Sequence, residues 1–353
     1  MDPLSYAAAQ KERFRAELYD FLRFPSVSAK SEHDGDTRRT ADWLAARLSA
    51  AGLTSEVIET AGHPIVLAEW RGAPGAPTVL VYGHYDVQPS EPLDEWLSPP
   101  FEPTVRDGRL YGRGTADDKG QLYMHVKALE AHLATRGALP VNVVVLAEGE
   151  EEVGSPNLVP FVQANRKRLA CDVVVISDSG MFAEGLPSLL FSLRGLAYFE
   201  LHVKGAKSDL HSGEYGGAVG NPGNALARII ASLHAPDGKV AIAGFYDDVR
   251  EWDAATRRQI AGLPHDDEAY RTELGVDALP GEAGYGTLER TWIRPTCDVN
   301  GILCGYTGQG AKTVLPNRAM AKVSFRLVPD QTPARVRALL EAHLAKVSPP
   351  GVT

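Results

Sequence analysis

Residues 78–86 read TVLVYGHYD, an apolar, β-branched run that leads directly into a glycine, a histidine and an aspartate. Similar runs occur at 141–147 (VNVVVLA), followed by EGEEE, and at 173–176 (VVVI), followed by Ser177 and Asp178. Short runs rich in valine are typical of strands that are buried on both faces of a sheet. We therefore predict three buried strands, each of which delivers polar side chains at its carboxyl end.

Helical patterns separate these strands. Leucine and valine recur at helical spacing between Leu122 and Leu133, and ADWLAARL at 41–48 behaves in the same way. Alternation of strands and helices predicts an α/β fold in which helices cover a mostly parallel sheet. We assign this first domain to residues 1–185.

The pattern changes in the second part of the chain, residues 186–353. Apolar and polar residues alternate at 199–204 and at 322–327, which is typical of strands with one exposed face. Asn221 and Thr332 each precede a proline and an apolar helical pattern, so we expect them to cap two helices. This combination predicts a smaller α+β domain with an antiparallel sheet.

Composition bounds the class of protein. The chain has 353 residues, 44% of them apolar, and a formal charge of −9, which excludes global disorder and argues against a general nucleic-acid binder. Three cysteines without a close pair indicate reduced thiols. There is neither a signal-peptide pattern at the start nor an apolar run long enough to span a membrane. We therefore expect a soluble, cytoplasmic protein.

One imidazole and several carboxylates follow the predicted strands, at the sheet edge where open α/β sheets bind ligands. The groups are His84 and Asp86, the run 148–152, Asp178, and, from the glycine-rich loop 112–120, Asp117 and Asp118. Clustered carboxylates repel one another unless cations neutralise them. Imidazole and carboxylate donors without a thiolate suit zinc, manganese or cobalt, and this many donors would occupy two metals.

Each acidic stretch also has an ordinary interpretation. A glutamate run is commonly a solvated loop, and two aspartates before a helix commonly cap it. Their convergence on one sheet edge favours the metal site. A two-metal phosphohydrolase is disfavoured, because no basic cluster or phosphate-cradling helix terminus accompanies the acids.

Several longer motifs make the chain recognisable. It resembles the aminoacylase/carnosinase-type metallopeptidases, dipeptidase branch, in the metal-binding motifs GHYDVQP (83–89), LYGRGTADDKG (110–120), EGEEEVGS (148–155) and ISDSG (176–180). It resembles their lid domain in SDLHSGEYGG (208–217) and AKTVLPNRAMAKVSFRLVP (311–329). The resemblance covers essentially the whole chain, and it implies a zinc-exopeptidase catalytic domain with an inserted ferredoxin-like lid that also mediates dimerisation.

The resemblance implies a role for each matching residue of the first domain. Glu151 would be the general base that takes a proton from a metal-bridged water. Asp86 would orient the neighbouring imidazole. The metal ligands would be His84, the bridging Asp117, Glu152 and Asp178. The resemblance also implies a cis peptide between Asp117 and the next residue.

In the lid, the resemblance assigns three substrate-binding residues. His211 would stabilise the oxyanion, from the partner subunit in dimeric relatives. Arg326 would hold a substrate carboxylate, and Thr313 would add a hydrogen bond nearby. Alone, a histidine or an arginine in such positions is more often just a surface residue.

One expected ligand has no counterpart. Members of the family take a further histidine from beyond the lid, whereas this chain ends in SPPGVT at 348–353, and His343 does not match. We therefore expect a fragment or, alternatively, a relative with one impaired metal site. The predicted activity is hydrolysis of dipeptides and short peptides with a free carboxyl terminus. The alternatives are an N-acyl amino acid deacylase and a catalytically impaired binding or dimerisation module.

Overall fold

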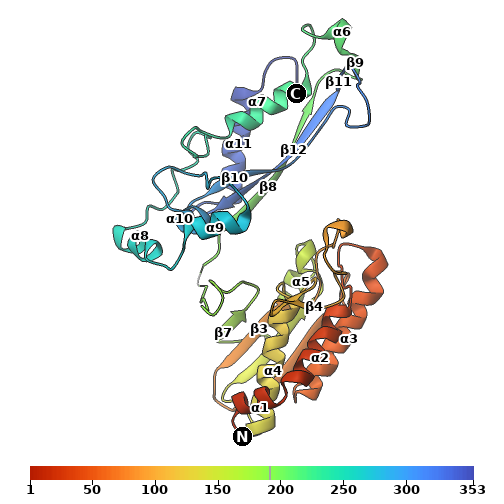
Figure 1. Cartoon of the computed structure of the whole chain (residues 1–353), viewed down its shortest axis with the longest axis vertical. Helices are drawn as coiled ribbons and strands as arrows, with labels where there is room; N and C mark the ends of the chain where they lie inside the picture. The colour runs from red at the N-terminus through yellow and green to blue at the C-terminus, as the bar shows by residue number, and fades with distance from the viewer. Residues whose placement is uncertain (191) are drawn as a thin grey trace. The chain divides into compact units, whose positions relative to one another are not determined.

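The computed structural model describes residues 1–190 and 192–353, which divide into two compact units (Figure 1). The first unit comprises Met1–Ser188 and the second Leu189–Thr353. Each unit has its own sheet and its own apolar core.

A five-stranded sheet forms the centre of the first unit. Its strands, in spatial order, are β1 (Thr54–Ile58), β2 (Ile65–Trp70), β6 (Asn142–Glu148), β3 (Thr78–His84) and β7 (Val173–Ile176). β3 pairs in parallel with β6 and β7, whereas β2 pairs antiparallel with β6 and β1. The α/β class is confirmed, but the sheet is mixed rather than mostly parallel. The cause is a β1–β2 hairpin, whose short connection suits antiparallel strands only.

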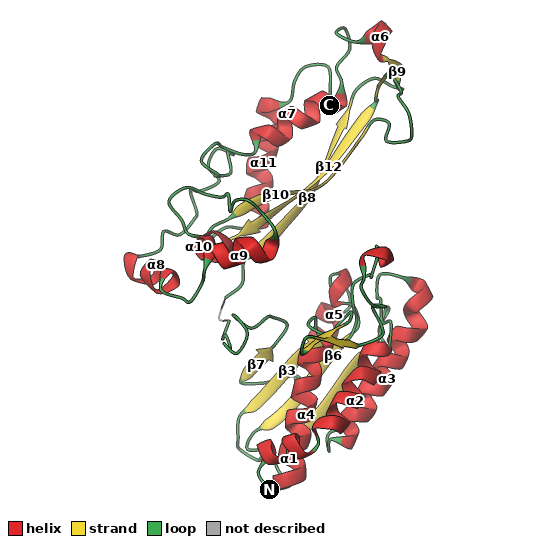
Figure 2. Ribbon diagram, viewed as in Figure 1, coloured by secondary structure: helices red, strands yellow, loops and turns green. Residues whose placement is uncertain are grey.

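Helices and a small hairpin complete the first unit. The helices are α1 (Pro3–Ala9), α2 (Lys11–Arg23), α3 (Asp34–Ala50), α4 (Lys119–Arg136) and α5 (Leu158–Ala164), with short 3₁₀ turns η1 (Ser31–His33), η2 (Leu93–Glu95) and η3 (Glu151–Val153). The hairpin is β4 (Thr104–Arg106) with β5 (Arg109–Tyr111). Figure 2 shows the long helices lying along the sheet.

Apolar side chains cover both faces of this sheet. One face packs against α3 and α4 through residues such as Leu44 and Val126, and the other packs against Phe161 of α5. The predicted burial of the strands holds for the interiors of β3 and β6. It fails for β7, where Val173 and Ile176 are 51% and 59% exposed, because β7 lies at the edge of the sheet and, among the described strands, pairs with β3 alone.

The second unit is built on a three-stranded antiparallel sheet, which confirms the predicted α+β pattern. Its strands are β10 (Thr296–Cys304), β12 (Arg318–Leu327) and β8 (Gly195–Lys204), and a separate two-stranded ribbon joins β9 (Leu210–His211) to β11 (Val314–Leu315). The helices are α6 (Ser212–Tyr215), α7 (Pro222–Ser232), α8 (Ala254–Ala261), α9 (Asp267–Leu274), α10 (Thr287–Trp292) and α11 (Pro333–Val347).

Helices α7 and α11 bury one face of this sheet. Ile229 and Leu340 of these helices pack against Val323 and Phe325 of β12. The predicted caps are confirmed, because the Asn221 side chain accepts hydrogen bonds from the first turn of α7 and Thr332 accepts one at the start of α11. The prolines in both first turns lack the main-chain N–H that would need a hydrogen-bond acceptor there.

Two further expectations can be compared with the structure. Cys171, Cys297 and Cys304 are all free, as predicted. In the part of the chain that the structure describes, no helix combines the length and the apolar character needed to cross a lipid bilayer.

Candidate metal centre

His84 lies at the carboxyl end of β3, fully buried, and is the centre of the acidic cluster. Its Nδ1 lies 3.1 Å from the main-chain oxygen of Asp86 and 3.3 Å from that residue's Oδ1. Its Nε2 lies 3.1 Å from Asp117 Oδ1, 3.7 Å from Asp178 Oδ2 and 4.0 Å from Glu151 Oε2. When the ring is neutral, as metal binding requires, a proton on Nδ1 faces the Asp86 oxygens and leaves Nε2 directed at the carboxylates.

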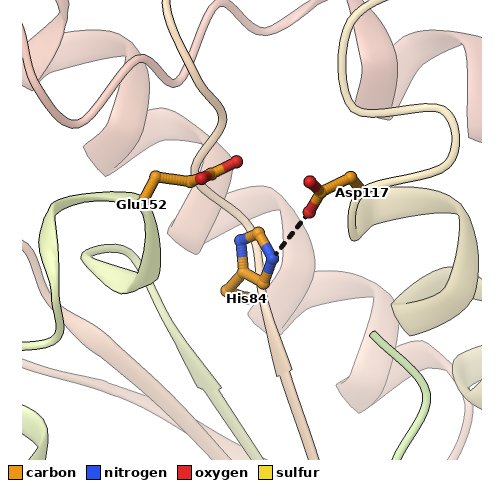
Figure 3. A group of neighbouring side chains, drawn as sticks. All are labelled: His84, Asp117 and Glu152. Atoms are coloured by element: carbon orange, nitrogen blue, oxygen red, sulfur yellow. Dashed lines mark hydrogen bonds and ion pairs between the residues drawn. The ribbon is translucent and has the colours of Figure 1, made fainter. Parts of the chain in front are cut away.

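Two overlapping groups of side chains have the spacing of a metal site. His84, Asp117 and Glu152 form one group, drawn in Figure 3, and His84, Glu151 and Asp178 form the other. Within each group the donor atoms lie within 4.8 Å of one another. The structure thus brings together His84 and four of the carboxylates that the sequence placed at this edge of the sheet, those of Asp117, Glu151, Glu152 and Asp178. The donors, one imidazole and carboxylate oxygens, fit zinc, manganese or cobalt ions.

The loop before α4 approaches β3 closely. Its Asp117–Asp118 peptide bond is cis, as the resemblance implies. Asp118 is 1% exposed and makes no capping bond to α4; instead its Oδ2 accepts a hydrogen bond from the His84 main-chain nitrogen at 3.2 Å. Its Oδ1 is buried without a partner among the described residues. A methyl group at Gly83 would lie 2.7 Å from Asp118 Oδ2, so the strand needs glycine there.

The glutamate run after β6 divides into two kinds of residue. Glu148 accepts hydrogen bonds from Tyr82 at 2.5 Å and from Ser155 at 2.9 Å, within the protein interior. Glu150, also buried, accepts a hydrogen bond from the His63 main-chain nitrogen at 3.1 Å. These two glutamates therefore fix the loop, and the pair that follows them is left to face His84. The sequence of the run alone does not show which glutamates hold the loop and which face His84.

Gln88 is a site neighbour that the sequence reasoning missed. Its side-chain nitrogen donates to Glu152 Oε2 at 2.6 Å. It lies inside the motif GHYDVQP, four residues after His84, so its place in that motif was the available signal. The contact turns one oxygen of Glu152 toward an amide rather than toward solvent.

Burial and mutual repulsion shift the pKa values of the clustered side chains. Burial raises the pKa of the Glu151, Glu152 and Asp178 carboxyls, and it raises the pKa of Asp118 to about 7. Burial alone would lower the pKa of His84, but the hydrogen bond and charge of Asp86 and the neighbouring carboxylates raise it to about 10. The metal-free cluster therefore retains protons at neutral pH. Divalent cations would neutralise the same charges in place of those protons.

The three predicted substrate-binding residues lie in the second unit, on exposed positions. His211 and Thr313 are neighbours, with Thr313 Oγ1 3.3 Å from His211 Nε2 and the Ser212 main-chain nitrogen bonded to Thr313 oxygen. Arg326 is exposed on β12, on the open face of the sheet. The alternation along β12 places Ser324 on the same face, but Ser324 is only 8% exposed, with Tyr198 and Asp298 beside it on the adjacent strands.

Comparison with known proteins identifies close relatives. The family model described as peptidase family M20/M25/M40 matches residues 80–346. A Cys-Gly metallodipeptidase of Schizosaccharomyces pombe is 34% identical over 351 residues, covering 96% of this chain and 74% of its own length. A beta-Ala-His dipeptidase of Homo sapiens is 32% identical over 95% of this chain, which spans 65% of that relative.

Solved structures agree with these relatives. An M20 family metallo-carboxypeptidase from Sulfolobus solfataricus superimposes with a TM-score of 0.85 at 39% sequence identity, and the match covers 96% of this chain and 77% of that one. The chain thus corresponds to between about 65% and 77% of the relatives compared above.

Proposed function

The chain belongs to the peptidase family M20/M25/M40, and from this premise we propose that it hydrolyses dipeptides and short peptides at the amide next to a free carboxyl-terminal residue. The dipeptidase names of two relatives that are more than 30% identical over nearly the whole chain support this substrate class. The observation that carries the proposal is the convergence of His84 with four carboxylates within metal-ligand spacing.

We assign two divalent cations, zinc in preference to manganese or cobalt, to His84, Asp117, Glu152 and Asp178. When bound, such cations polarise a scissile carbonyl and lower the pKa of nearby water. Glu151 takes the proton from the attacking water and passes it to the leaving amine. Burial raises the pKa of Glu151, the direction that makes its carboxylate a better proton acceptor.

In the second unit we assign substrate binding to His211, Thr313 and Arg326. The arginine pairs with the substrate carboxylate, and its exposure on the sheet face leaves its guanidinium available for that contact. The first unit is then the catalytic domain and the second the lid, through which we propose that the protein forms a homodimer. A cytoplasmic location is consistent with three free cysteines.

The test is a Glu151→Gln variant of this chain, compared with Glu12→Gln, an exposed glutamate on α2. Hydrolysis of an Ala-Ala type dipeptide is followed in the presence of zinc, and metal binding is followed by calorimetry. We expect Glu151→Gln to lower turnover by about 10²–10⁴-fold while metal binding remains close to that of the parent. Parent-like turnover in Glu151→Gln would refute the assignment of the base. A parent chain that turns over no peptide with any metal would favour the binding or dimerisation module instead.

A second candidate is carboxypeptidase action on longer peptides. It is favoured by the structural neighbour from Sulfolobus solfataricus, which is described as a metallo-carboxypeptidase. Initial rates on a dipeptide, a pentapeptide and an N-acetyl amino acid distinguish the possibilities. Preference for the pentapeptide would select the carboxypeptidase, and rates on the N-acetyl amino acid that equal or exceed the dipeptide rates would select the deacylase.

A further inference from the structure

We propose that Ser28, which lies outside every motif discussed above, is a positioning residue of the metal centre. Its hydroxyl holds the carboxylate of Asp86, and Asp86 in turn fixes the His84 ring and the main chain of the Glu151–Glu152 pair. The inference rests on the proposed function for the identity of the reaction, but the geometry on which it stands is independent of the substrate.

The Asp86 carboxylate has four neighbours, two for each oxygen. Oδ1 lies 3.2 Å from the Glu151 main-chain nitrogen and 3.3 Å from His84 Nδ1. Oδ2 lies 3.1 Å from the Glu152 main-chain nitrogen and 2.6 Å from the Ser28 hydroxyl. A carboxylate offers about four acceptor positions, so the set is complete. Asp86 therefore links β3 to the loop after β6 at the point where both face the cluster.

Ser28 supplies the shortest of these bonds. A distance of 2.6 Å is typical of a hydroxyl that donates to an ionised carboxylate, and such bonds are about twice as strong as neutral ones. Asp86 is fully buried, so the protein must supply all of its donors. Without the Ser28 hydroxyl, one acceptor position of a buried charge would have no partner, and the carboxylate would be free to rotate away from the two main-chain nitrogens.

The segment that carries Ser28 is itself held in place. The Ser26 hydroxyl donates to Tyr85 oxygen at 2.7 Å, and Val87 nitrogen donates to Ser26 oxygen at 2.9 Å. Val27 and Val87 form a parallel bridge between the two segments. The Ser28 hydroxyl is thus presented from a fixed backbone rather than from a mobile loop, as a positioning role requires.

The first measurement is the zinc affinity of the metal-free chain, read by calorimetry for the parent, Ser28→Ala and Ser28→Thr. We expect Ser28→Ala to weaken zinc binding by about tenfold, the lower end of the cost of removing a group that orients a metal ligand, because Ser28 acts on His84 through Asp86. Ser28→Thr keeps a hydroxyl at this position and should restore affinity to within about threefold of the parent. Equal affinities for the parent and Ser28→Ala would overturn the proposal.

Ser26→Ala is the matched control, because it removes a hydroxyl of the same segment that bonds to a main-chain oxygen, that of Tyr85, rather than to Asp86. It should lower the unfolding temperature while keeping zinc affinity within about threefold of the parent. If Ser26→Ala weakens zinc binding as much as Ser28→Ala does, the effect belongs to the segment as a whole and the proposal fails. Circular dichroism checks that each variant is folded.

Kinetics at saturating zinc provide the second readout. Since the Ser28 hydroxyl acts on the site through Asp86, its loss should lower kcat, by about tenfold, and leave KM for the dipeptide unchanged. A raised KM with an unchanged kcat would instead assign Ser28 to substrate contact and overturn the proposal. The role of Ser28 and the proposed peptide hydrolysis can be refuted independently, because zinc affinities test Ser28 even if the parent chain hydrolyses no peptide.

Discussion

Replacing Asp118 with asparagine should change how the stability of the metal-free protein depends on pH. The carboxyl is 1% exposed, one of its oxygens has no hydrogen-bond partner within residues 1–190 and 192–353, and burial raises its pKa from 3.8 to about 7. Between these two pH values the folded protein holds a proton on Asp118 that the unfolded chain has lost. Its contribution to stability is therefore fully present below about pH 4 and is lost as the pH rises toward 7.

The magnitude follows from the number of protons. One extra proton bound by the folded state corresponds to about 1.4 kcal/mol of unfolding free energy per pH unit. Over the interval from 3.8 to about 7 this amounts to about 4 kcal/mol. Asparagine has no charge to bury and can still accept the hydrogen bond from the His84 main-chain nitrogen. In Asp118→Asn, the unfolding free energy should therefore fall less steeply as the pH rises than it does in the parent.

The assay is urea unfolding of the metal-free protein at several pH values between 5 and 6.5, followed by circular dichroism. This window lies below the pKa of about 7 to which burial lowers Lys119, a group that would act in the opposite direction at higher pH. The control is Asp172→Asn, which alters an exposed carboxylate that also accepts a main-chain hydrogen bond, from Thr78. Identical slopes in the parent and in Asp118→Asn would refute the reasoning.

Three further variants test packing around the site and within the second unit. Gly83→Ala would place a methyl group 2.7 Å from Asp118 Oδ2 and should weaken zinc binding at least tenfold by calorimetry. Glu282→Leu would leave Arg294, 4% exposed, without its bidentate partner, and should lower the free energy of urea unfolding of the second unit by about 3–5 kcal/mol. Phe325→Ala would empty a fully buried position of β12 and should cost about 3–5 kcal/mol in the same assay.

Each variant has a clear contradicting result. Parent-like zinc affinity in Gly83→Ala would mean that β3 and the loop before α4 can separate without disturbing the ligands. A loss below about 1 kcal/mol in Glu282→Leu would mean that the Arg294 guanidinium finds other partners or water. A similarly small loss in Phe325→Ala would mean that α7 and α11 close over the vacated space.

Sequence patterns predicted the parts of the fold that depend on local signals. β3 and β6 were visible because their apolar runs are uninterrupted, and α7 was visible because a cap, a proline and an apolar stripe coincide. β10 escaped prediction because a register shift between Val299 and Gly301 breaks its alternation. The antiparallel addition of β1 and β2 is a property of pairing across the sheet, which no single stretch of sequence carries.

The candidate site shows the same division. Motifs predicted which side chains converge, since strand ends of one sheet must meet at one edge. They did not reveal that Glu148 and Glu150 are used to hold their own loop, nor that Asp118 turns away from its helix toward His84. These roles depend on donors that lie far away in the sequence, such as Tyr82 for Glu148 and the His63 main chain for Glu150.

The β9–β11 ribbon has a consequence for recognition. His211 is paired with Val314, and the Ser212 main-chain nitrogen donates to the Thr313 main-chain oxygen. The His211 imidazole and the Thr313 hydroxyl are therefore carried by one hydrogen-bonded ribbon. If the two residues bind substrate as proposed, a substrate group that contacts His211 lies within reach of Thr313, at a spacing that the ribbon fixes. The ordering cost of bringing these two side chains together is met when the second unit folds, so substrate binding by the proposed pair would not incur that cost again.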